Sequence, residues 1–576
     1  MADTPLLVFG PRSLDYDFGP GHPLTPRRFG PGIDLLTAVG AEPGLAPEPA
    51  KDDELLLCHT PSYLEVVKRF SEHDHGWMDP EAGIGTNGDD PPFLGMHDAA
   101  AAVAGGSLRA KEAILRGEVE HAFHPGGGLH HAMRERASGF CIYNDPALAI
   151  AGARRDGLRV LYVDLDVHHG DGVEAIHAAD PGVLTVSFHE SGRYLFPGTG
   201  FVDEVGEAGA AGTVVNVPLE PETGEDAWLA AVTPLVPELA AAFGPDLIVS
   251  QHGADSHAWD PLAHLRNTTT AMGEAARLVD AVAHWYAGGR WLATGGGGYG
   301  VYAVVPRSWS LVWLAGAHRE VPSRIPEAWR ERWSGEAARY GTASLPTTFT
   351  DRPNAGEPMS RTQDAAERES SATAALVRQL AVPSLIRAAV DRSWWQPLPG
   401  PGLGPSVPAA LAAAPAATST PTIVPLVDAA TWDRLTVVPR VVSPAEPADV
   451  RAIVQAALSA GAWVTVALAA GVVVGLAVSA GAEPGEAELL ALGVAPGWRG
   501  AGLGRRLLAA HLEAIPDGLR MTATVTVAER DAAEPLPYAT RIAIARRLLA
   551  GGGFEVEQAP GPIGRVDPLA ITAVRH

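Results

Sequence analysis

The segment YVDLDVHHGDG, residues 162–172, places three aspartates and two histidines directly after a hydrophobic run. Alternate side chains of an extended chain share a face, so Asp164, Asp166 and His168 are expected to point the same way. Burying carboxylates without partners is costly, and the usual compensation is a metal ion, a paired cation or a hydrogen-bond network. The segment therefore predicts a metal site at the end of a buried strand, with a solvated loop rich in Asp and His as the alternative.

Further polar and aromatic residues follow other predicted strands or lie in predicted turns. They are the adjacent His130 and His131 after a glycine run, Asp255 after the apolar run DLIVS, Tyr299 in a glycine-rich loop, and Phe140 and Phe196 in turn-rich stretches. Each has an ordinary explanation by itself, such as a helix cap, a loop or a core phenylalanine. Together these residues favour a single composite site.

The elements that must position this site are strand-like runs that alternate with Ala-, Leu- and Glu-rich helical stretches, from residue 1 to about 340. The runs that lead into the chemically dense segments are 158–167, 182–190, 244–253 and 289–298. This alternation predicts an α/β fold, an open parallel sheet flanked by helices. The polar residues follow the carboxyl ends of the strands, where such sheets place their ligand crevice.

Composition limits the class of protein. The chain has 576 residues, 46% of them hydrophobic and 19% charged, which predicts two or more globular domains. A formal net charge of -24 argues against nucleic acid as a partner. Two cysteines and an N-terminus without a basic, apolar leader indicate a cytoplasmic protein. The apolar stretch 462–480 is long enough to cross a bilayer, but its valines and interrupting glycines favour a buried hairpin, so no membrane partner is expected.

The chain is expected to divide into two domains. Residues 1–390 form the first, with its core in 1–340, and the Pro-, Gly- and Ala-rich stretch 391–422 is a linker. Residues 423–576 form a smaller α+β domain. Its predicted elements are a helix at 443–458, the valine-rich hairpin, a strand at 487–496 and a helix at 504–514.

The motifs of the first domain also carry a resemblance. HPGGGLHH, GFCIYND, DLDVHHGDG, FPGTG, GADSHAWDP and GGGGY occur in the order typical of the zinc-dependent histone deacetylase superfamily. Residues 1 to about 340–390 resemble this superfamily, and within it the bacterial acetoin-utilisation (AcuC-like) deacetylases. The resemblance implies an arginase/deacetylase-like fold and hydrolysis of acetyl-lysine.

The resemblance also implies roles for individual residues. Those that match the catalytic centre are the zinc ligands Asp166, His168 and Asp255, the general base His130 oriented by Asp164, His131 paired with Asp171, and the oxyanion donor Tyr299. An Asp/His/Asp set leaves coordination open for water and substrate, as a catalytic zinc site requires, and Fe²⁺ is an alternative occupant.

The remaining matches concern the substrate and a structural K⁺ ion. Phe140 and Phe196 match the walls of the acyl-lysine tunnel, Leu262 stands where many eukaryotic members have Met, Asp89 rather than Asp90 is the favoured acidic residue of the rim, and Asp164 with Ser187 match a potassium site. Exchanging Leu and Met nearly conserves volume, so this departure is expected to adjust the shape of the tunnel only.

The second domain contains Arg499-x-x-Gly502-x-Gly504 between a predicted strand and a predicted helix. Glycines there leave backbone N–H groups free to meet a phosphate at a helix N-terminus. Residues 423–576 therefore resemble a GNAT-type acetyltransferase. The resemblance implies that acetyl-CoA is bound by the cofactor-binding residues Val494, Arg499, Gly500, Gly502, Leu503 and Gly504.

Transfer activity in this domain is a separate question. Many GNAT enzymes carry a tyrosine acid where this sequence has Leu549, and Glu488 is the candidate transferase base. Binding of acetyl-CoA without transfer is therefore an open alternative.

Together the resemblances imply a bifunctional protein, a metal-dependent lysine deacetylase joined to an acetyl-CoA-binding N-acetyltransferase domain. The expected partners are an acetylated protein or a small acetylated amine, and acetyl-CoA. Two other functions stay open: deacetylation of small acetylated amines such as acetylpolyamines, and an acetyl-lysine binder with an acetyl-CoA-sensing domain. The matched set of ligands, base and Tyr299 counts against a binding role without catalysis in the first domain.

Overall fold

The computed structural model describes the chain in two stretches. The first is residues 4–391 without 73–77, 87, 208 and 352–359, and the second is 421–575 without 427–430, 433–434, 438–446, 470–471, 483–484, 495–502, 517, 527–547, 551 and 561–565. The chain forms two compact units, of which the first comprises Met1–Val236, Pro245–Ala283 and Gly289–Leu385, and the second holds the chain from Ile386 onward. Most of the predicted linker 391–422 lies outside the described residues.

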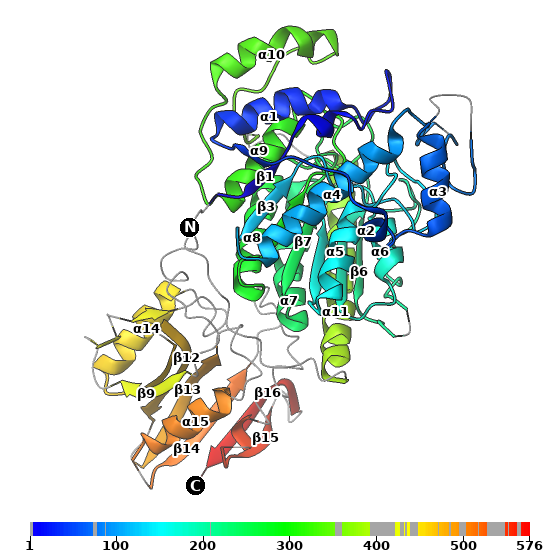
Figure 1. The fold of residues 1–576 in the computed structure, drawn as a ribbon. Helices are drawn as coiled ribbons and strands as arrows, with labels where there is room; N and C mark the ends of the chain where they lie inside the picture. The colour runs from blue at the N-terminus through cyan, green and yellow to red at the C-terminus, as the bar shows by residue number, and fades with distance from the viewer. Residues whose placement is uncertain are drawn as a thin grey trace. The chain divides into compact units, whose positions relative to one another are not determined.

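The first unit is built on an eight-stranded sheet with the order β2-β1-β3-β8-β7-β4-β5-β6, and all of these pairings are parallel (Figure 1). Its strands are β1 (Leu6–Val8), β2 (Pro43–Leu45), β3 (His121–His124), β4 (Val160–Asp164), β5 (Val183–Glu190), β6 (Val214–Leu219), β7 (Leu247–Gln251) and β8 (Trp291–Thr294). The predicted open parallel sheet is confirmed. The four strands expected before the polar segments are β4, β5, β7 and β8.

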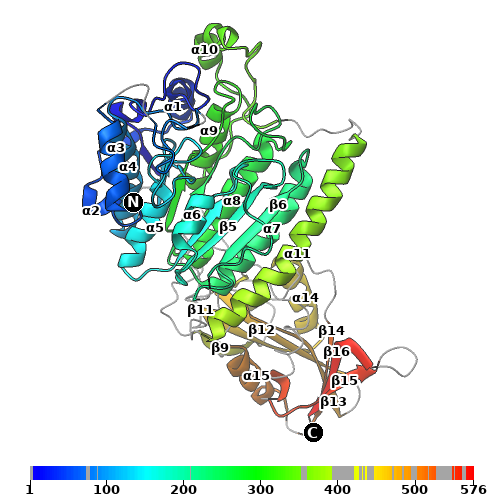
Figure 2. The same cartoon turned by 90° about the vertical axis from the view of Figure 1, so that its right-hand side faces the viewer.

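Helices cover both faces of this sheet (Figures 1 and 2). They are α1 (Phe29–Ala38), α2 (Asp52–Leu55), α3 (Pro61–Phe70), α4 (Met96–Leu115), α5 (Asp145–Arg155), α6 (Asp171–His177), α7 (Glu225–Phe243), α8 (Thr269–Tyr286), α9 (Val305–Gly316), α10 (Glu327–Arg339) and α11 (Arg361–Asp391), with short 3-10 helices at Pro11–Leu14 and Pro26–Arg28. Because both faces are covered, every residue of β4, β5, β7 and β8 is buried. The central strands accordingly read as continuous apolar runs instead of alternating ones.

In the described part of the chain, α7 is the one helix long and apolar enough to cross a membrane by length and composition. About two thirds of its apolar window, 67%, is buried inside the fold, as in the core helix of a globular domain. The described residues of the apolar stretch 462–480 are not helical. They form an antiparallel pair of strands, β11 (Trp463–Ala469) and β12 (Val472–Gly481), so the predicted hairpin is confirmed.

The second unit is a mainly antiparallel sheet with the order β15-β16-β14-β13-β12-β11-β9, and β10 pairs with β12. Its other elements are β9 (Thr422–Leu426), β10 (Thr436–Val437), α14 (Pro447–Ser459), β13 (Glu486–Val494), α15 (Leu503–Glu513), β14 (Arg520–Thr526), β15 (Glu555–Pro560) and β16 (Val566–Arg575). Apolar residues of the sheet, α14 and α15 form the core of this unit. The predicted helices and strands of the second domain are present in the expected order.

One pairing in this sheet stops early. The parallel strands β13 and β14 pair from Glu486 with Arg520 to Leu489 with Ala523. Beyond this point β13 continues to Val494 and pairs with β12 alone among the described strands, while β14 continues alongside β16. The two strands therefore separate at the end of β13 that leads toward α15.

Candidate functional site

Three buried side chains converge just beyond the carboxyl ends of β4 and β7. The Nδ1 atom of His168 lies 3.1 Å from Oδ1 of Asp166 and 3.2 Å from Oδ2 of Asp255. The candidate ligand atoms of the three residues all lie within 4.8 Å of one another. Since β4 and β7 are adjacent and parallel, the two loops that follow them leave the sheet at the same edge. The structure therefore brings together the three residues predicted as metal ligands.

The electrostatics of this cluster suit a cation. Burial opposes the charge of His168, but hydrogen bonds with Asp166 and Asp255 raise the pKa of this imidazole to about 10. Burial, followed by the charge of Asp166, raises the pKa of Asp255 to about 6. Two carboxylates in a dry site thus hold a proton on the histidine between them. A divalent ion would supply the positive charge in place of that proton, and the carboxylate/imidazole donor set is one that Zn²⁺ and Fe²⁺ accept.

The backbone around the carboxylates leaves no room for further side chains. A Cβ atom at Gly253 would lie 2.1 Å from Oδ2 of Asp166, and one at Gly297 would lie 1.9 Å from Oδ2 of Asp255. The amide of Gln251 donates to Oδ2 of Asp166 over 2.6 Å, and the N–H of Gly297 donates to the same oxygen over 2.8 Å. Neighbouring donors therefore fix the direction of each carboxylate before any ligand arrives.

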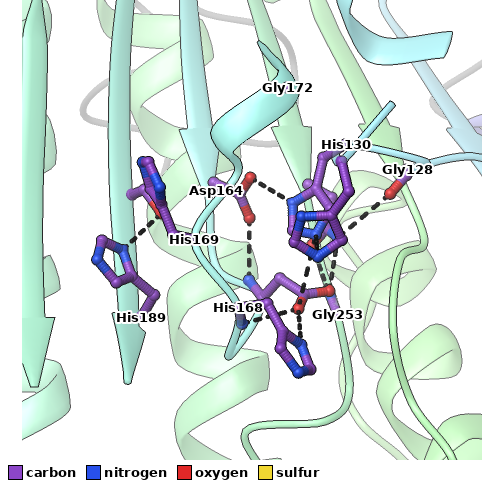
Figure 3. A network of polar contacts seen from close by, with 12 residues as sticks. Gly128, His130, Asp164, His168, His169, Gly172, His189 and Gly253 are labelled. Atoms are coloured by element: carbon purple, nitrogen blue, oxygen red, sulfur yellow. Dashed lines mark hydrogen bonds and ion pairs between the residues drawn. The ribbon is translucent and has the colours of Figure 1, made fainter. Parts of the chain in front are cut away.

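Two histidine–aspartate pairs lie beside the three ligands. His130 Nδ1 lies 2.8 Å from Oδ2 of Asp164, and His131 Nδ1 lies 2.7 Å from Oδ1 of Asp171. The two Nε2 atoms are 3.0 Å apart. Figure 3 shows Asp164 beside the ring of His130, with His168 close by. The structure thus makes both predicted pairings.

The two imidazoles differ in protonation. Burial opposes a charge on His130, but the charges of Asp164 and Asp166 raise its pKa to about 9. Burial, together with the charge of His130, lowers the pKa of His131 to about 4. The surrounding charges therefore favour a proton on His130 and disfavour one on His131.

A pocket of about 280 Å³ is lined by the two histidines, by Asp166 and His168, and by Phe140 and Tyr299. The ring of Phe140 lies 6.0 Å from that of Tyr299, edge to face. The ring of Phe196 lies 5.0 Å from that of His131 and is partly exposed. Burial raises the pKa of Tyr299 well above its usual value, so its hydroxyl stays protonated and able to donate. Of the two predicted tunnel residues, Phe140 lines this pocket together with the predicted oxyanion donor Tyr299, whereas Phe196 packs against His131.

Two further charged residues support the site without having been predicted from the sequence. Asp260 accepts the backbone N–H of Tyr299 over 2.8 Å and that of Leu262 over 3.1 Å, which links two loops of the site. Arg28 is buried and donates to the carbonyl of Gly296 over 2.7 Å. Asp260 stands in the quoted GADSHAWDP motif, so its position was a usable signal. The contact of Arg28 spans most of the domain, and no local pattern marks it.

The residues predicted for the rim and for the potassium site differ in burial and in hydrogen-bond partners. Asp89 is partly exposed, whereas Asp90 is buried, and burial raises the pKa of Asp90 well above its usual value. The side chain of Leu262 is half-buried. Asp164 and Ser187 face each other in register on β4 and β5. Each has protein partners, since Asp164 accepts from the Tyr162 hydroxyl over 2.7 Å and Ser187 contacts a histidine of its own strand over 2.8 Å.

The second predicted site is described in part. Arg499, Gly500 and Gly502 lie outside the described residues. Leu503 begins α15, and Gly504 follows it, where an added Cβ would lie 3.7 Å from Val494. The end of β13 and the start of α15 therefore meet, as a phosphate-binding turn between them requires.

The two transferase candidates differ in their surroundings. Glu488 is half-buried in the middle of β13, opposite Thr522 of β14. Leu549 is buried in the apolar core of the second unit. A buried leucine can neither donate nor accept a proton, so an acid at this position is absent.

Comparison with known proteins divides the chain in the same way. Residues 22–315 match the histone deacetylase domain family and residues 431–536 match the acetyltransferase (GNAT) family. The acetoin utilization protein AcuC of Bacillus subtilis is 40% identical over 370 residues, which are 63% of this chain and 94% of that protein. AcuC of Staphylococcus xylosus is 36% identical over 359 residues, covering 61% and 91% of the two chains.

Solved structures give the same result for the fold. A crystal structure of a histone deacetylase homologue in complex with SAHA has a TM-score of 0.56 and 28% identity, and the match covers 64% of this chain and all of that one. A homologue from Aquifex aeolicus has a TM-score of 0.55 and 27% identity over the same shares.

Proposed function

This chain belongs to the histone deacetylase family and carries a GNAT acetyltransferase domain after it, and from that premise we propose that its first unit is a zinc-dependent deacetylase of acetyl-lysine in proteins. The observation that carries the proposal is the buried group of Asp166, His168 and Asp255 at the floor of a pocket lined by aromatic side chains. A zinc ion held there supplies Lewis acidity toward an amide carbonyl and lowers the pKa of a water molecule.

The protein's own residues divide the remaining tasks. His131 is neutral and accepts the proton of the attacking water, and the same imidazole returns that proton to the departing amine. His130 stays protonated between Asp164 and its partner histidine and stabilises negative charge. We therefore assign the base to His131 instead of His130, the residue that the family resemblance alone implied.

Tyr299 holds the oxyanion. Its hydroxyl is protonated throughout the neutral range, and Asp260 fixes its loop through the backbone N–H. Losing one such donor commonly lowers kcat about 10²–10³-fold. Phe140 and Phe196 offer apolar faces to the methylene stem of a lysine. Such a channel accepts a neutral acyl-lysine and disfavours the charged amine of the product, so the product should leave more readily than the substrate.

The test is hydrolysis of acetyl-lysine peptides and of acetylated polyamines by the zinc-loaded full chain. Activity on peptides that is lost in Asp166→Asn and falls about 10²–10³-fold in Tyr299→Phe supports the proposal. Tyr302→Phe is the matched control, since this hydroxyl, three residues away, contacts Glu336. Turnover of the polyamines alone would replace the protein substrate by a small acetylated amine, and turnover of neither class, with zinc bound, would leave an acetyl-lysine binder.

For the second unit we propose binding of acetyl-CoA where β13 and β14 separate. The strands stop pairing after Leu489, so the backbone of 490–494 is available on that side among the described strands, and α15 begins beside Val494. Pantetheine is an extended amide chain that such a strand edge can hydrogen-bond, and the helix start suits its pyrophosphate. Glu488 is our candidate base for transfer. Isothermal titration of the full chain with acetyl-CoA tests binding, and transfer to an amine panel by the wild type and Glu488→Gln tests the base.

A cytoplasmic location fits both proposed substrates, because acetyl-CoA and acetylated metabolic enzymes share that compartment. Potassium at Asp164 and Ser187 stays part of the proposal for the first unit, on the support of their register on β4 and β5.

A further inference from the structure

A second group of metal-ligating side chains lies at the amino-terminal end of β3, away from the carboxyl ends of the strands that carry the first site. It consists of His121, Asp280, His284 and His318, whose candidate ligand atoms all lie within 4.8 Å of one another. His121 is the first residue of β3, whereas the loop to the catalytic His130 leaves from the other end of that strand. The proposed deacetylase chemistry uses none of these four residues.

The contacts within this group converge on a single oxygen. Nε2 of His318 lies 3.0 Å, and Nε2 of His121 lies 3.3 Å, from Oδ1 of Asp280. The rings of the two histidines are 5.2 Å apart and nearly perpendicular. In a tetrahedral zinc site with bonds of about 2.0–2.2 Å, neighbouring ligand atoms are about 3.3–3.5 Å apart. The two measured separations are close to that geometry.

Three different elements supply the group. Asp280 and His284 are four residues apart in α8, which places them on one face of that helix. His121 comes from β3 and His318 from the segment after α9. His121, Asp280 and His284 are buried, and the side chain of His318 is 10% exposed. A site closed by four protein side chains and shielded from solvent is typical of structural metal sites.

The backbone at His318 is a separate indication. This residue has a φ of 53°, in the left-handed region, two residues after the end of α9. Glycine is the usual residue where a helix ends in this conformation, because a side chain there is strained. Backbone strain at a histidine whose ring contacts a buried carboxylate indicates that the imidazole has a functional role.

We propose that His121, Asp280, His284 and His318 bind a second divalent transition-metal ion, with Zn²⁺ preferred. Imidazole nitrogens and one carboxylate oxygen suit Zn²⁺, whereas Mg²⁺ and Ca²⁺ prefer sites made of oxygen. The ion ties β3, α8 and the end of α9 together. It differs from the proposed catalytic ion in having four protein ligands and no open position.

The test counts zinc in the full-length protein. Stripped protein is reloaded with Zn²⁺, equilibrated with a weak chelator, and assayed by inductively coupled plasma mass spectrometry. We expect wild type to retain two ions per chain, His318→Gly and Asp280→Asn to retain one with deacetylase activity unchanged, and Asp166→Asn to retain one without activity. The double variant Asp166→Asn with His318→Gly should retain none. Because the Asp166 and His318 variants empty different sites, failure of this proposal and failure of the deacetylase proposal give different results.

His318→Gly also separates a metal ligand from a packing residue. Glycine relieves the left-handed backbone, so the metal-free variant should melt no lower than metal-free wild type, whereas added zinc should raise the melting temperature of wild type more than that of the variant. A wild-type count of one ion that Asp166→Asn removes completely would overturn the proposal. So would a His318→Gly variant that still binds two ions.

Discussion

The ligand sites proposed for the two units are built in opposite ways. The first unit fixes charged side chains at the ends of parallel strands, and each carboxylate has named donors, as at Asp166 and Asp164. The site proposed in the second unit consists of strand edges and a helix start, which present backbone groups. Buried charge requires a particular partner at a particular place, whereas backbone N–H groups are the same in every residue. A site made of side chains can therefore be recognised from residue types and spacing in the sequence, whereas a site made of backbone groups gives only a weak sequence pattern.

The largest expected effect comes from the histidine pair of the first unit. His131→Ala should lower kcat by about 10³-fold or more, because it removes the neutral imidazole that moves the proton. His130→Ala should cost less, about 10²-fold, because it removes a charge beside the reaction and leaves the base. Steady-state kinetics with zinc content matched between variants makes the comparison. A larger loss in the His130 variant would return the role of base to that residue.

A buried ion pair should show how strongly the first unit depends on paired charge. Asp351 contacts buried Arg307 at 2.6 Å and His257 at 2.9 Å. Asp351→Asn should lower the free energy of unfolding of this unit by about 2–4 kcal/mol and leave the calorimetric transition of the second unit unchanged. Asp364→Asn is the matched control, since its pair with Arg368 is exposed and should be worth less than about 1 kcal/mol.

The pH dependence of that effect has a definite sign. Burial opposes ionisation of Asp351, but the hydrogen bond from His257 and the charge of Arg307 lower its pKa well below the usual value. A lowered folded-state pKa gives stability that is complete above the unfolded value, about 4, and is lost as the pH falls below it. The difference between wild type and Asp351→Asn should therefore shrink between about pH 4 and pH 2. A constant difference over this range would mean that Asp351 contributes by packing alone.

In the second unit, removing an arginine of the proposed phosphate-binding turn should weaken acetyl-CoA binding without destabilising the fold. Arg499→Ala is expected to weaken acetyl-CoA binding about 10–100-fold, as loss of a charged hydrogen bond does, with deacetylase activity unchanged. Arg520→Ala removes an arginine of the same unit that pairs with Glu486 on the neighbouring strand, so it controls for net charge. Equal loss in both variants, measured by isothermal titration, would show that binding follows overall charge instead of the turn.

The smallest effect is expected at Leu262, which the family resemblance implies is near the acyl-lysine tunnel. Leu262→Met nearly conserves volume at a half-buried position, so kcat/KM should change by less than about tenfold on any peptide. Phe196→Ala on the same peptides provides the scale, since it removes an aromatic ring that packs against His131. A larger change in kcat/KM for Leu262→Met than for Phe196→Ala would show that the loop of Leu262 determines peptide specificity.

Sequence reasoning succeeded where chemistry and periodicity coincide. The strands before Asp166, Asp255 and Tyr299 are apolar runs that end at polar residues, and the structure contains β4, β7 and β8 there. It missed Arg28, whose contact with Gly296 spans 268 positions of the chain. It also missed the group around Asp280, because an aspartate and a histidine four apart on a helix are an ordinary surface pattern until β3 and the end of α9 are placed beside them. Such sites exist only in the tertiary fold.

The crowded glycines of the first site also bear on how this protein can vary. A glycine codon becomes an alanine codon by one base change, so the methyl group is among the additions that chance offers most often. At Gly253 and Gly297 that methyl would have to share space with a ligand carboxylate, at 2.1 and 1.9 Å, whereas at Gly504 its nearest neighbours are 3.7 Å away. We therefore expect homologues to tolerate alanine at Gly504 without loss of the fold, and to keep glycine at Gly253 and Gly297.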